Sequence, residues 1–254
     1  MFLYYVIMFF LLGTIFGSFY NVVGYRIPKG ESIVFPSSHC PNCNHFLKPV
    51  ELIPIFSYFI QGGKCKNCKI KISLFYPIFE FLCGILFVLC FVVFGISYEL
   101  IIALTFISMM IIIILTDYYY MIIPDSVLIV FTILLAIETI LIKGIAILLT
   151  SLSNALIAFI IMFLIKVLGD KIFKKEAMGG GDVKLMFVFG FIIGWQMSII
   201  SIVFASFIAL PVSIYILYKK KTNVIPFGPF LCISALIIYL LNLDIDKLIS
   251  FLYY

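Results

Sequence analysis

The sequence predicts an all-α, polytopic membrane protein with about eight transmembrane helices and one small polar domain between the first helix and the second. Of the 254 residues, 65% are hydrophobic and only 11% are charged, whereas soluble domains have about 25% charged residues. Apolar runs of roughly 20 residues, the length that a helix needs to cross a bilayer, recur along the chain. The one long polar stretch contains two CxxC pairs.

Eight apolar segments are candidate transmembrane helices. They lie at residues 2–23, 76–96, 100–116, 126–142, 145–168, 183–194, 197–218 and 228–241. The first has no basic leader before it and no small-residue cleavage site after it, so we expect it to remain as a helix. The sixth is too short to span a bilayer unaided. We expect it either to be re-entrant or to extend past its neighbours.

The distribution of basic residues predicts the orientation of these segments, because short cytoplasmic loops carry an excess of Lys and Arg. Fifteen of the 17 basic residues fall on one side: Arg26, Lys29, Lys48, Lys64, Lys66, Lys69, Lys71, Lys166, Lys171, Lys174, Lys175, Lys184, Lys219, Lys220 and Lys221. Only Lys143 and Lys247 fall on the other. We therefore expect both termini outside and the loops after the first, third, fifth and seventh segments in the cytoplasm. The net charge of +5 then reflects topology and contact with the lipid surface, not nucleic-acid binding.

The polar stretch after the first segment has the cysteine pattern of a zinc site. Cys40 pairs with Cys43 and Cys65 with Cys68, and residues 44–64 separate the two CxxC pairs. Each CxxC turn directs two sulfurs at one point, and two such turns complete a tetrahedron around Zn²⁺. A loop this small has little core of its own. The metal would therefore supply much of its folding free energy.

Two disulfides or four free thiols are the alternatives to zinc. The expected cytoplasmic location argues against disulfides, because the cytoplasm is reducing. His39 and His45 flank the first pair and could substitute as ligands, although four thiolates already fill a tetrahedral site. Cys83, Cys90 and Cys232 lie in apolar segments, where they are most simply small packing residues.

Three parts follow from these patterns. Residues 1–25 form the first transmembrane helix, residues 26–75 a small cytoplasmic zinc-knuckle domain, and residues 76–254 a multi-helix membrane domain.

Acidic residues in the apolar segments are candidates for function, because each costs at least a few kcal/mol at the bilayer centre. The candidates are Glu80, Asp117, Asp125, Glu138 and Asp182, with Glu99 in an outer loop. Asp117 ends the third segment and Asp182 precedes the sixth, both on the cytoplasmic side, so the two carboxylates can meet at one depth. Gly179, Gly180 and Gly181 lack side chains, so an extended substrate backbone could approach Asp182 closely.

Two carboxylates that share one proton are the machinery of an aspartic protease. The ionised member takes a proton from the attacking water, while the protonated member polarises the peptide carbonyl. Such a pair titrates as a coupled unit.

Structural roles compete with this interpretation. The three glycines could form a flexible loop and Asp182 could cap the helix that follows it. Asp125 follows Pro124 at a helix start, so capping is its simplest role. Glu80 and Glu138 fit a hydrogen-bonded packing role as well as a catalytic one.

Several longer motifs occur in a fixed order along the chain. They are GSFYNVVGYRIP at 17–28, CPNC at 40–43, KCKNC at 64–68, YPIFE at 76–80, TDYYYMIIPD at 116–125, MGGGDVKL at 178–185 and PFGPFL at 226–231. In order and spacing they resemble the motifs of the type IV prepilin peptidases, which are bifunctional leader peptidases and N-methyltransferases of the GxGD aspartyl protease class. By this resemblance Asp117 and Asp182 are the catalytic aspartates, and Cys40, Cys43, Cys65 and Cys68 are zinc ligands.

The resemblance also implies a reaction and a location. Members of the family cut the basic leader of prepilins or pseudopilins just after a glycine. They then methylate the new N-terminal residue with S-adenosylmethionine. The substrate is itself a membrane helix, so we expect a multi-pass protein of the bacterial cytoplasmic (inner) membrane whose active site and zinc loop face the cytoplasm, with residues 76–254 as the peptidase domain.

Methyl transfer rests on the resemblance alone, because the chain has no glycine-rich strand-to-helix fingerprint for S-adenosylmethionine. Asn21 and Arg26, at the end of the first segment, are the candidate residues for it, and interfacial anchoring is their alternative role. Two further interpretations stay open. One is a peptidase that only cleaves. The other is a non-enzymatic transporter or assembly scaffold, which would use Asp125 and Glu138 most naturally.

Overall fold

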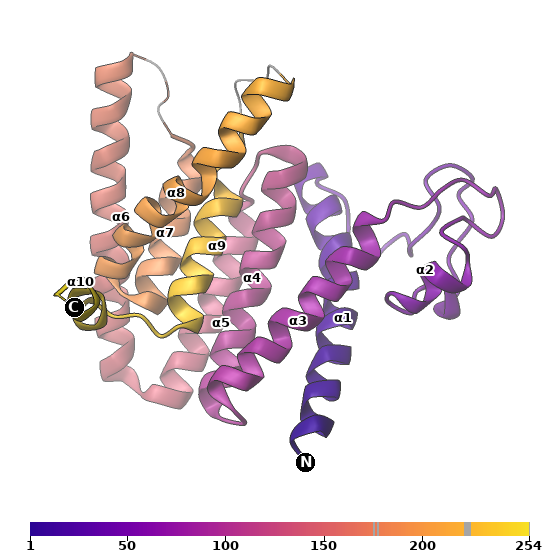
Figure 1. The fold of residues 1–254 in the computed structure, drawn as a ribbon, viewed down its shortest axis with the longest axis horizontal. Helices are drawn as coiled ribbons and strands as arrows, with labels where there is room; N and C mark the ends of the chain where they lie inside the picture. The colour runs from indigo at the N-terminus through magenta and orange to yellow at the C-terminus, as the bar shows by residue number, and fades with distance from the viewer. Residues whose placement is uncertain (175, 177, 221–224, 254) are drawn as a thin grey trace. The chain divides into compact units, whose positions relative to one another are not determined.

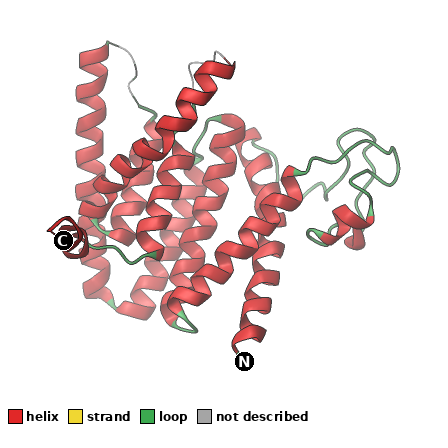
Figure 2. Cartoon of the chain, viewed as in Figure 1, coloured by secondary structure: helices red, strands yellow, loops and turns green. Residues whose placement is uncertain are grey.

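The computed structural model describes residues 1–174, 176, 178–220 and 225–253 (Figure 1). Within these residues the protein is helical and contains no strand (Figure 2). Two isolated β-bridges, His39 with Phe46 and Lys64 with Lys71, lie in the polar loop. The predicted all-α fold is therefore confirmed. Lys175 and Lys221 were among the basic residues from which the orientation was predicted, and they lie outside the described residues.

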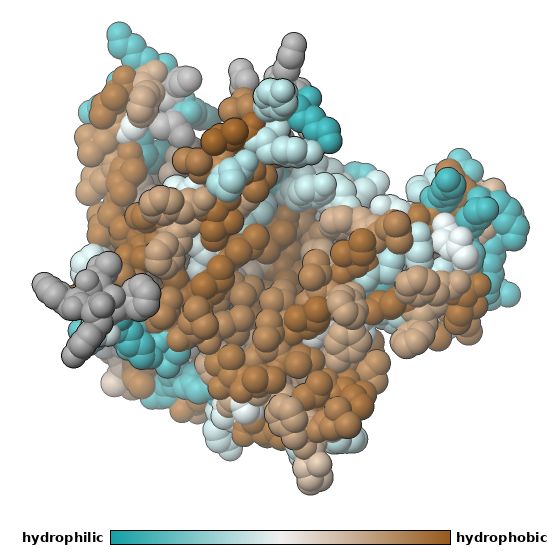
Figure 3. Space-filling view, viewed as in Figure 1, coloured by the Kyte–Doolittle hydropathy of each residue, from teal (hydrophilic) through white to brown (hydrophobic). Residues whose placement is uncertain are grey.

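Eight helices overlap the eight predicted segments, with ends that differ by up to five residues. They are α1 (Phe2–Arg26), α3 (Phe75–Phe94), α4 (Tyr98–Tyr120), α5 (Asp125–Lys143), α6 (Ile145–Phe173), α7 (Gly180–Ile193), α8 (Trp195–Lys220) and α9 (Gly228–Leu240). All but α7 and α9 are long and apolar enough to cross a membrane. Figure 3 shows hydrophobic side chains over most of the helix surface in view. Such a surface suits a lipid environment.

Two short helices were not predicted. Helix α2 (Phe56–Ile60) lies in the polar loop, and helix α10 (Ile245–Tyr253) follows α9. The start of α10 is fixed by Asp244, whose Oδ1 accepts the Lys247 N–H at 2.8 Å.

The chain divides into two compact units, Met1–Leu104 and Thr105–Tyr254. In the first, α1 packs along α3 through small residues. A Cβ on Gly13 would lie 2.7 Å from the carbonyl oxygen of Cys83, and a Cβ on Gly17 would lie 2.8 Å from the Cys83 Cβ. The two backbones can approach this closely only because glycine has no side chain. Cys83 is buried in this interface, which is the packing role expected for it.

In the second unit, the short helix α7 is enclosed by other helices. It contacts α5, α6, α8 and α9, and most of its residues are buried, among them Val183, Leu185 and Val188, which point in different directions around the helix. A Cβ on Gly190 would lie 2.7 Å from the Asn154 carbonyl oxygen and 2.9 Å from the Ala155 Cα, both in α6, so these two helices pack backbone to backbone. Because protein rather than lipid surrounds α7, its 14 residues need not span the hydrocarbon core alone.

Candidate active site and metal site

The structure brings Asp117 and Asp182 together. Asp117 lies in the last turn of α4, and Asp182 lies in the first turn of α7. Both side chains are buried, with 6% and 8% of the residue exposed, and the two carboxylates interact electrostatically. Two buried carboxylates whose charges interact repel each other when both are ionised, which is the arrangement in which a pair of acids can share one proton.

The Asp117 carboxylate is held by the start of α9. The backbone N–H of Gly228 donates to its Oδ2 at 2.9 Å. Helix α4 ends three residues later because Met121 adopts a left-handed conformation, with φ of 54°, while its N–H still bonds to the Asp117 carbonyl at 2.9 Å. The PFGPFL motif thus contributes to the site, although sequence reasoning assigned it no role.

The three glycines before Asp182 have three different surroundings. A Cβ on Gly179 would lie 3.3 Å from Oδ2 of Asp182, and a Cβ on Gly181 would lie 2.9 Å from the Cβ of Ile123, in the loop between α4 and α5. A Cβ on Gly180 would meet no atom within 4 Å. Gly179 and Gly181 therefore allow close packing within the protein, and only Gly180 faces open space.

Lys166 of α6 secures the segment just before the glycines. Its Nζ donates to the carbonyl of Met178 at 2.9 Å and to Oδ2 of Asp170 at 3.1 Å. Since the lysine is largely buried, with 19% of its side chain exposed, this contact fixes where the chain enters α7. The sequence offered no signal for it beyond the presence of a lysine near the end of an apolar segment.

The remaining membrane acids have partners of their own. Oδ1 and Oδ2 of Asp125 lie 2.7 and 2.8 Å from Nζ of Lys184. Glu138 accepts a hydrogen bond from the Thr105 hydroxyl at 2.7 Å.

Glu80 accepts the N–H of Ile55 at 2.7 Å. Ile55 has a positive φ of 64°, an unfavourable conformation for a β-branched residue. Glu80 thus ties the polar loop to α3, which fits the first of its two proposed roles, hydrogen-bonded packing.

Each CxxC pair and its turn form one knuckle, the first at 40–43 and the second at 65–68. The four cysteines of the two knuckles form one cluster in the first unit. All four Sγ atoms lie within 4.8 Å of one another. Sγ of Cys40 is 3.7 Å from that of Cys68, and Sγ of Cys43 is 3.9 Å from that of Cys65. Neighbouring sulfurs of a tetrahedral site with Zn–S bonds of about 2.3 Å lie about 3.8 Å apart. The cluster can therefore hold a metal ion, and its thiols and spacing fit zinc.

The two knuckles have the same backbone geometry. The N–H of Asn44 donates to the Cys40 carbonyl at 2.9 Å, and the N–H of Lys69 donates to the Cys65 carbonyl at 3.0 Å. Asn44 and Lys69, the residues after each second cysteine, both have a positive φ. Hydrogen bonds, chiefly from the backbone N–H of Ile70, lower the pKa of Cys68 to about 6, and the thiolate is the form that binds metal.

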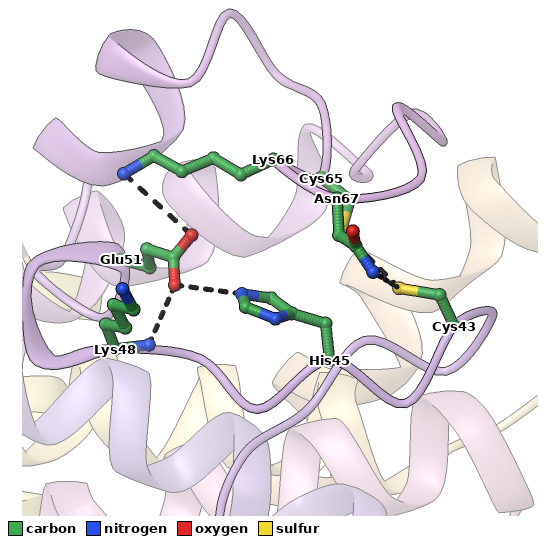
Figure 4. A network of polar contacts seen from close by, with 7 residues as sticks. All are labelled: Cys43, His45, Lys48, Glu51, Cys65, Lys66 and Asn67. Carbon is green, nitrogen blue, oxygen red and sulfur yellow. Dashed lines mark hydrogen bonds and ion pairs between the residues drawn. The ribbon is translucent and has the colours of Figure 1, made fainter.

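A buried carboxylate joins the two knuckles (Figure 4). Oε2 of Glu51 accepts the Lys48 N–H at 2.8 Å and lies 3.4 Å from Nε2 of His45, while Oε1 lies 3.9 Å from Nζ of Lys66. His45 follows the first knuckle and Lys66 lies inside the second. The Lys48 N–H holds the pKa of Glu51 below its usual value. Sequence reasoning missed this network, and it considered His45 only as a substitute ligand.

Asn21 and Arg26 are both buried in α1. Asn21 Nδ2 donates to the Gly17 carbonyl at 3.2 Å, and Arg26 Nη1 donates to the Ser32 carbonyl at 2.9 Å. Both side chains are thus engaged by main-chain carbonyls of their own segment.

These features define a multi-pass, all-helical membrane protein with a buried pair of aspartates and a four-cysteine site. Residues 11–94 match the bacterial peptidase A24 N-terminal domain, and residues 104–214 match the type IV leader peptidase family. The chain belongs to this family.

Similar proteins extend over nearly the whole chain. A prepilin leader peptidase/N-methyltransferase of Bacillus subtilis (strain 168) is 38% identical over 245 residues, which cover 95% of both chains. The protein of that name from Myxococcus xanthus is 34% identical over 80% of this chain and 60% of its own length, and the one from Pseudomonas aeruginosa is 29% identical over 89% of this chain and 86% of its own. No solved structure matches the chain.

Proposed function

We propose that this protein is a membrane aspartyl endopeptidase. It removes the basic leader of type IV prepilins or pseudopilins after a glycine, at the cytoplasmic face of the inner membrane, and then N-methylates the new N-terminal residue. The observation that carries the proposal is the buried, electrostatically coupled pair of Asp117 and Asp182 in a chain whose relatives are prepilin leader peptidases/N-methyltransferases.

The two aspartates share the work of peptide hydrolysis in this proposal. The ionised carboxylate takes a proton from water as the oxygen attacks the carbonyl carbon of the glycine before the cut. The protonated partner donates a hydrogen bond to the carbonyl oxygen, where negative charge develops. The leaving amine then receives a proton, and the pair returns to sharing one. Burial strengthens both interactions, since little water screens them.

The glycines before Asp182 allow the substrate to reach the carboxylates. The space beside Gly180 supports a role in admitting an extended substrate backbone, while Gly179 and Gly181 keep the chain close to Asp182 and Ile123. The substrate is a membrane helix with a short basic leader, so its cleavage site lies at the membrane surface. The excess of basic residues on one side of the eight segments supports a cytoplasmic location for the aspartates and for the cysteine loop.

Zinc has a structural part in this proposal. Bound by Cys40, Cys43, Cys65 and Cys68, it would cross-link the two knuckles and stabilise the loop of residues 26–75. Residues 76–254 carry the peptidase.

Asn21 and Arg26 remain the candidates for methyl transfer. Replacing each by Ala should leave cleavage intact and reduce methylation.

The proposal is tested by incubating purified protein with a prepilin-like peptide whose basic leader ends in Gly followed by Phe. Mass spectrometry should find a cut after the glycine and, with S-adenosylmethionine present, a product heavier by one methyl group. A cut product that never gains the methyl group would identify a peptidase that only cleaves. If no product forms, the enzymatic proposal fails.

The proposed orientation has its own test. Reporters fused after Lys71 and after Lys143 should read cytoplasmic and external, respectively. The opposite pattern would place the aspartates away from a cytoplasmic leader.

A further inference from the structure

Helix α9 begins at the Asp117 carboxylate. Its first residue, Gly228, is buried, and its N–H donates to Oδ2 of Asp117 across 111 positions of sequence. The next residue is Pro229, which has no N–H to offer, and the N–H groups of Phe230 and Leu231 bond back to the Phe227 carbonyl at 3.1 Å. Among the backbone donors at the start of α9, it is therefore Gly228 that serves the carboxylate.

Gly228 is also required sterically. A Cβ at this position would lie 2.6 Å from Oδ2 of Asp117 and 3.1 Å from its Cγ, closer than non-bonded carbon and oxygen atoms pack. The φ of Gly228 lies outside the left-handed region, so the glycine is needed for space and not for its backbone conformation. A carboxylate on one methylene group has little freedom to move away. Any side chain at 228 would therefore displace Asp117 or the start of α9.

The local sequence stiffens this contact. Pro226 and Pro229 flank Phe227 and Gly228, and each proline fixes its own φ. Asp117 is in the last turn of α4, where the helix dipole is unfavourable to a negative charge, whereas the start of α9 presents a favourable one. The negative charge of Asp117 is thus not stabilised by its own helix, α4, but it is stabilised by the Gly228 N–H at the start of α9.

We propose that Gly228 is a positioning residue of the peptidase site: its N–H fixes the Asp117 carboxylate in one orientation, and its missing side chain leaves the space that this carboxylate fills. The inference rests on the proposed function, in which Asp117 is one of the two catalytic carboxylates. Gly228 acts through Asp117 and contacts no substrate. Its loss should therefore affect the chemical step more than substrate binding.

The first test is the steady-state kinetics of Gly228→Ala on the prepilin-like peptide. Misplacing a catalytic group lowers the rate of the chemical step, so kcat should fall about 10-fold or more while KM stays nearly constant. Ile233→Ala is the matched control, because Ile233 lies on the same helix with 39% of the residue exposed and should keep wild-type kcat. A wild-type kcat in Gly228→Ala would overturn the inference.

Asp117→Asn, measured in parallel, separates this inference from the proposed function. If Asp117→Asn cleaves like wild type, the proposed function fails. If Asp117→Asn is inactive and Gly228→Ala keeps its kcat, the positioning role alone fails.

A double-mutant cycle tests the steric part without relying on activity. Gly228→Ala should lower the thermal midpoint in the wild-type background. It should have little effect in an Asp117→Ala background, because the added methyl group then enters the space left by the carboxylate. Even if Gly228→Ala alone fails to fold, the double variant should fold. Equal destabilisation in both backgrounds would show that Gly228 does not act through Asp117.

Discussion

Lys184 of α7 forms an ion pair with Asp125 of α5, with its Nζ 2.7 and 2.8 Å from the two carboxylate oxygens. Lys184 lies two residues after Asp182, so this ion pair joins the two helices close to the candidate site. About half of each side chain is exposed, 51% for Lys184 and 59% for Asp125. Exposed ion pairs contribute about 0–1 kcal/mol to stability. Asp125 is therefore an exposed, ion-paired acid, whereas Asp117 and Asp182 are buried.

We predict that Asp125→Asn cleaves the prepilin-like peptide within a few-fold of the wild-type rate. Its free energy of unfolding should change by less than about 1 kcal/mol. The rate is measured on folded, membrane-inserted protein, with Lys184→Met as the matched removal of the partner. Complete loss of cleavage in Asp125→Asn would mean that this acid takes part in the chemistry.

The cysteine cluster predicts one zinc ion per chain. Cys40→Ser with Cys65→Ser removes one ligand from each knuckle, so the metal content should fall and residues 26–75 should become sensitive to proteolysis. A chelator should have the same effect on the wild-type protein. Elemental analysis and limited proteolysis measure both outcomes. Active protein without metal, or a loop that resists proteolysis after chelation, would contradict this prediction.

Glu51 should make the stability of the loop depend on pH. Its pKa is lowered in the folded protein, chiefly by the Lys48 N–H. The stability that it contributes is therefore fully present above the ordinary carboxyl pKa of about 4.3, and it is lost as the pH falls through that value towards the lower folded-state pKa.

The comparison of wild type with Glu51→Gln isolates this contribution, since metal release at low pH affects both proteins. At pH 7 the wild-type loop should exchange its amide hydrogens more slowly than the variant, and the difference should shrink as the pH falls below 5. A difference that is constant from pH 7 to pH 4 would exclude Glu51 as the titrating group.

Gly181, in the first turn of α7, packs against Ile123, in the loop between α4 and α5. Gly181→Ala should destabilise the protein by about 1–3 kcal/mol, the usual cost of overpacking, and should reduce cleavage because Asp182 is the next residue. Ile123→Gly in the same chain should restore part of both losses, because it removes the Cβ that would lie 2.9 Å from the new methyl group. Thermal midpoints and initial rates measure the effect. An equally large loss in the double variant would exclude this contact as the cause.

The sequence was sufficient to predict those features of the fold and site that depend on hydrophobicity, on charge or on the spacing of cysteines. The apolar runs placed eight helices because a bilayer demands long apolar segments. The pattern of basic residues predicted that Asp117 and Asp182 lie on the same side of the membrane, and in the structure both are buried and their charges interact. The spacing of the CxxC pairs predicted a cluster of four thiols, which the structure contains.

Most of the contacts that the sequence did not predict join residues that are far apart in the chain. Such contacts leave no local pattern in the sequence. The bond from Gly228 to Asp117 spans 111 positions, and the pair of Lys184 and Asp125 spans 59. Glu51 is close in sequence to His45, but its burial arises only when the two knuckles fold together. Helix α10 has nine residues, too few to produce a strong apolar signal. The motif PFGPFL at 226–231 was the one available indication that the start of α9 has a special role.

The most direct test of the account is cleavage of a prepilin-like substrate, with a basic leader ending in Gly and followed by Phe, by wild type, Asp117→Asn and Asp182→Asn. Asparagine keeps the size of the side chain but cannot exchange a proton. If the two carboxylates share the chemistry, wild type cuts after the glycine, and each variant, still folded and inserted, is slower by at least about 100-fold. If either variant cuts as fast as wild type, the two-carboxylate mechanism is wrong.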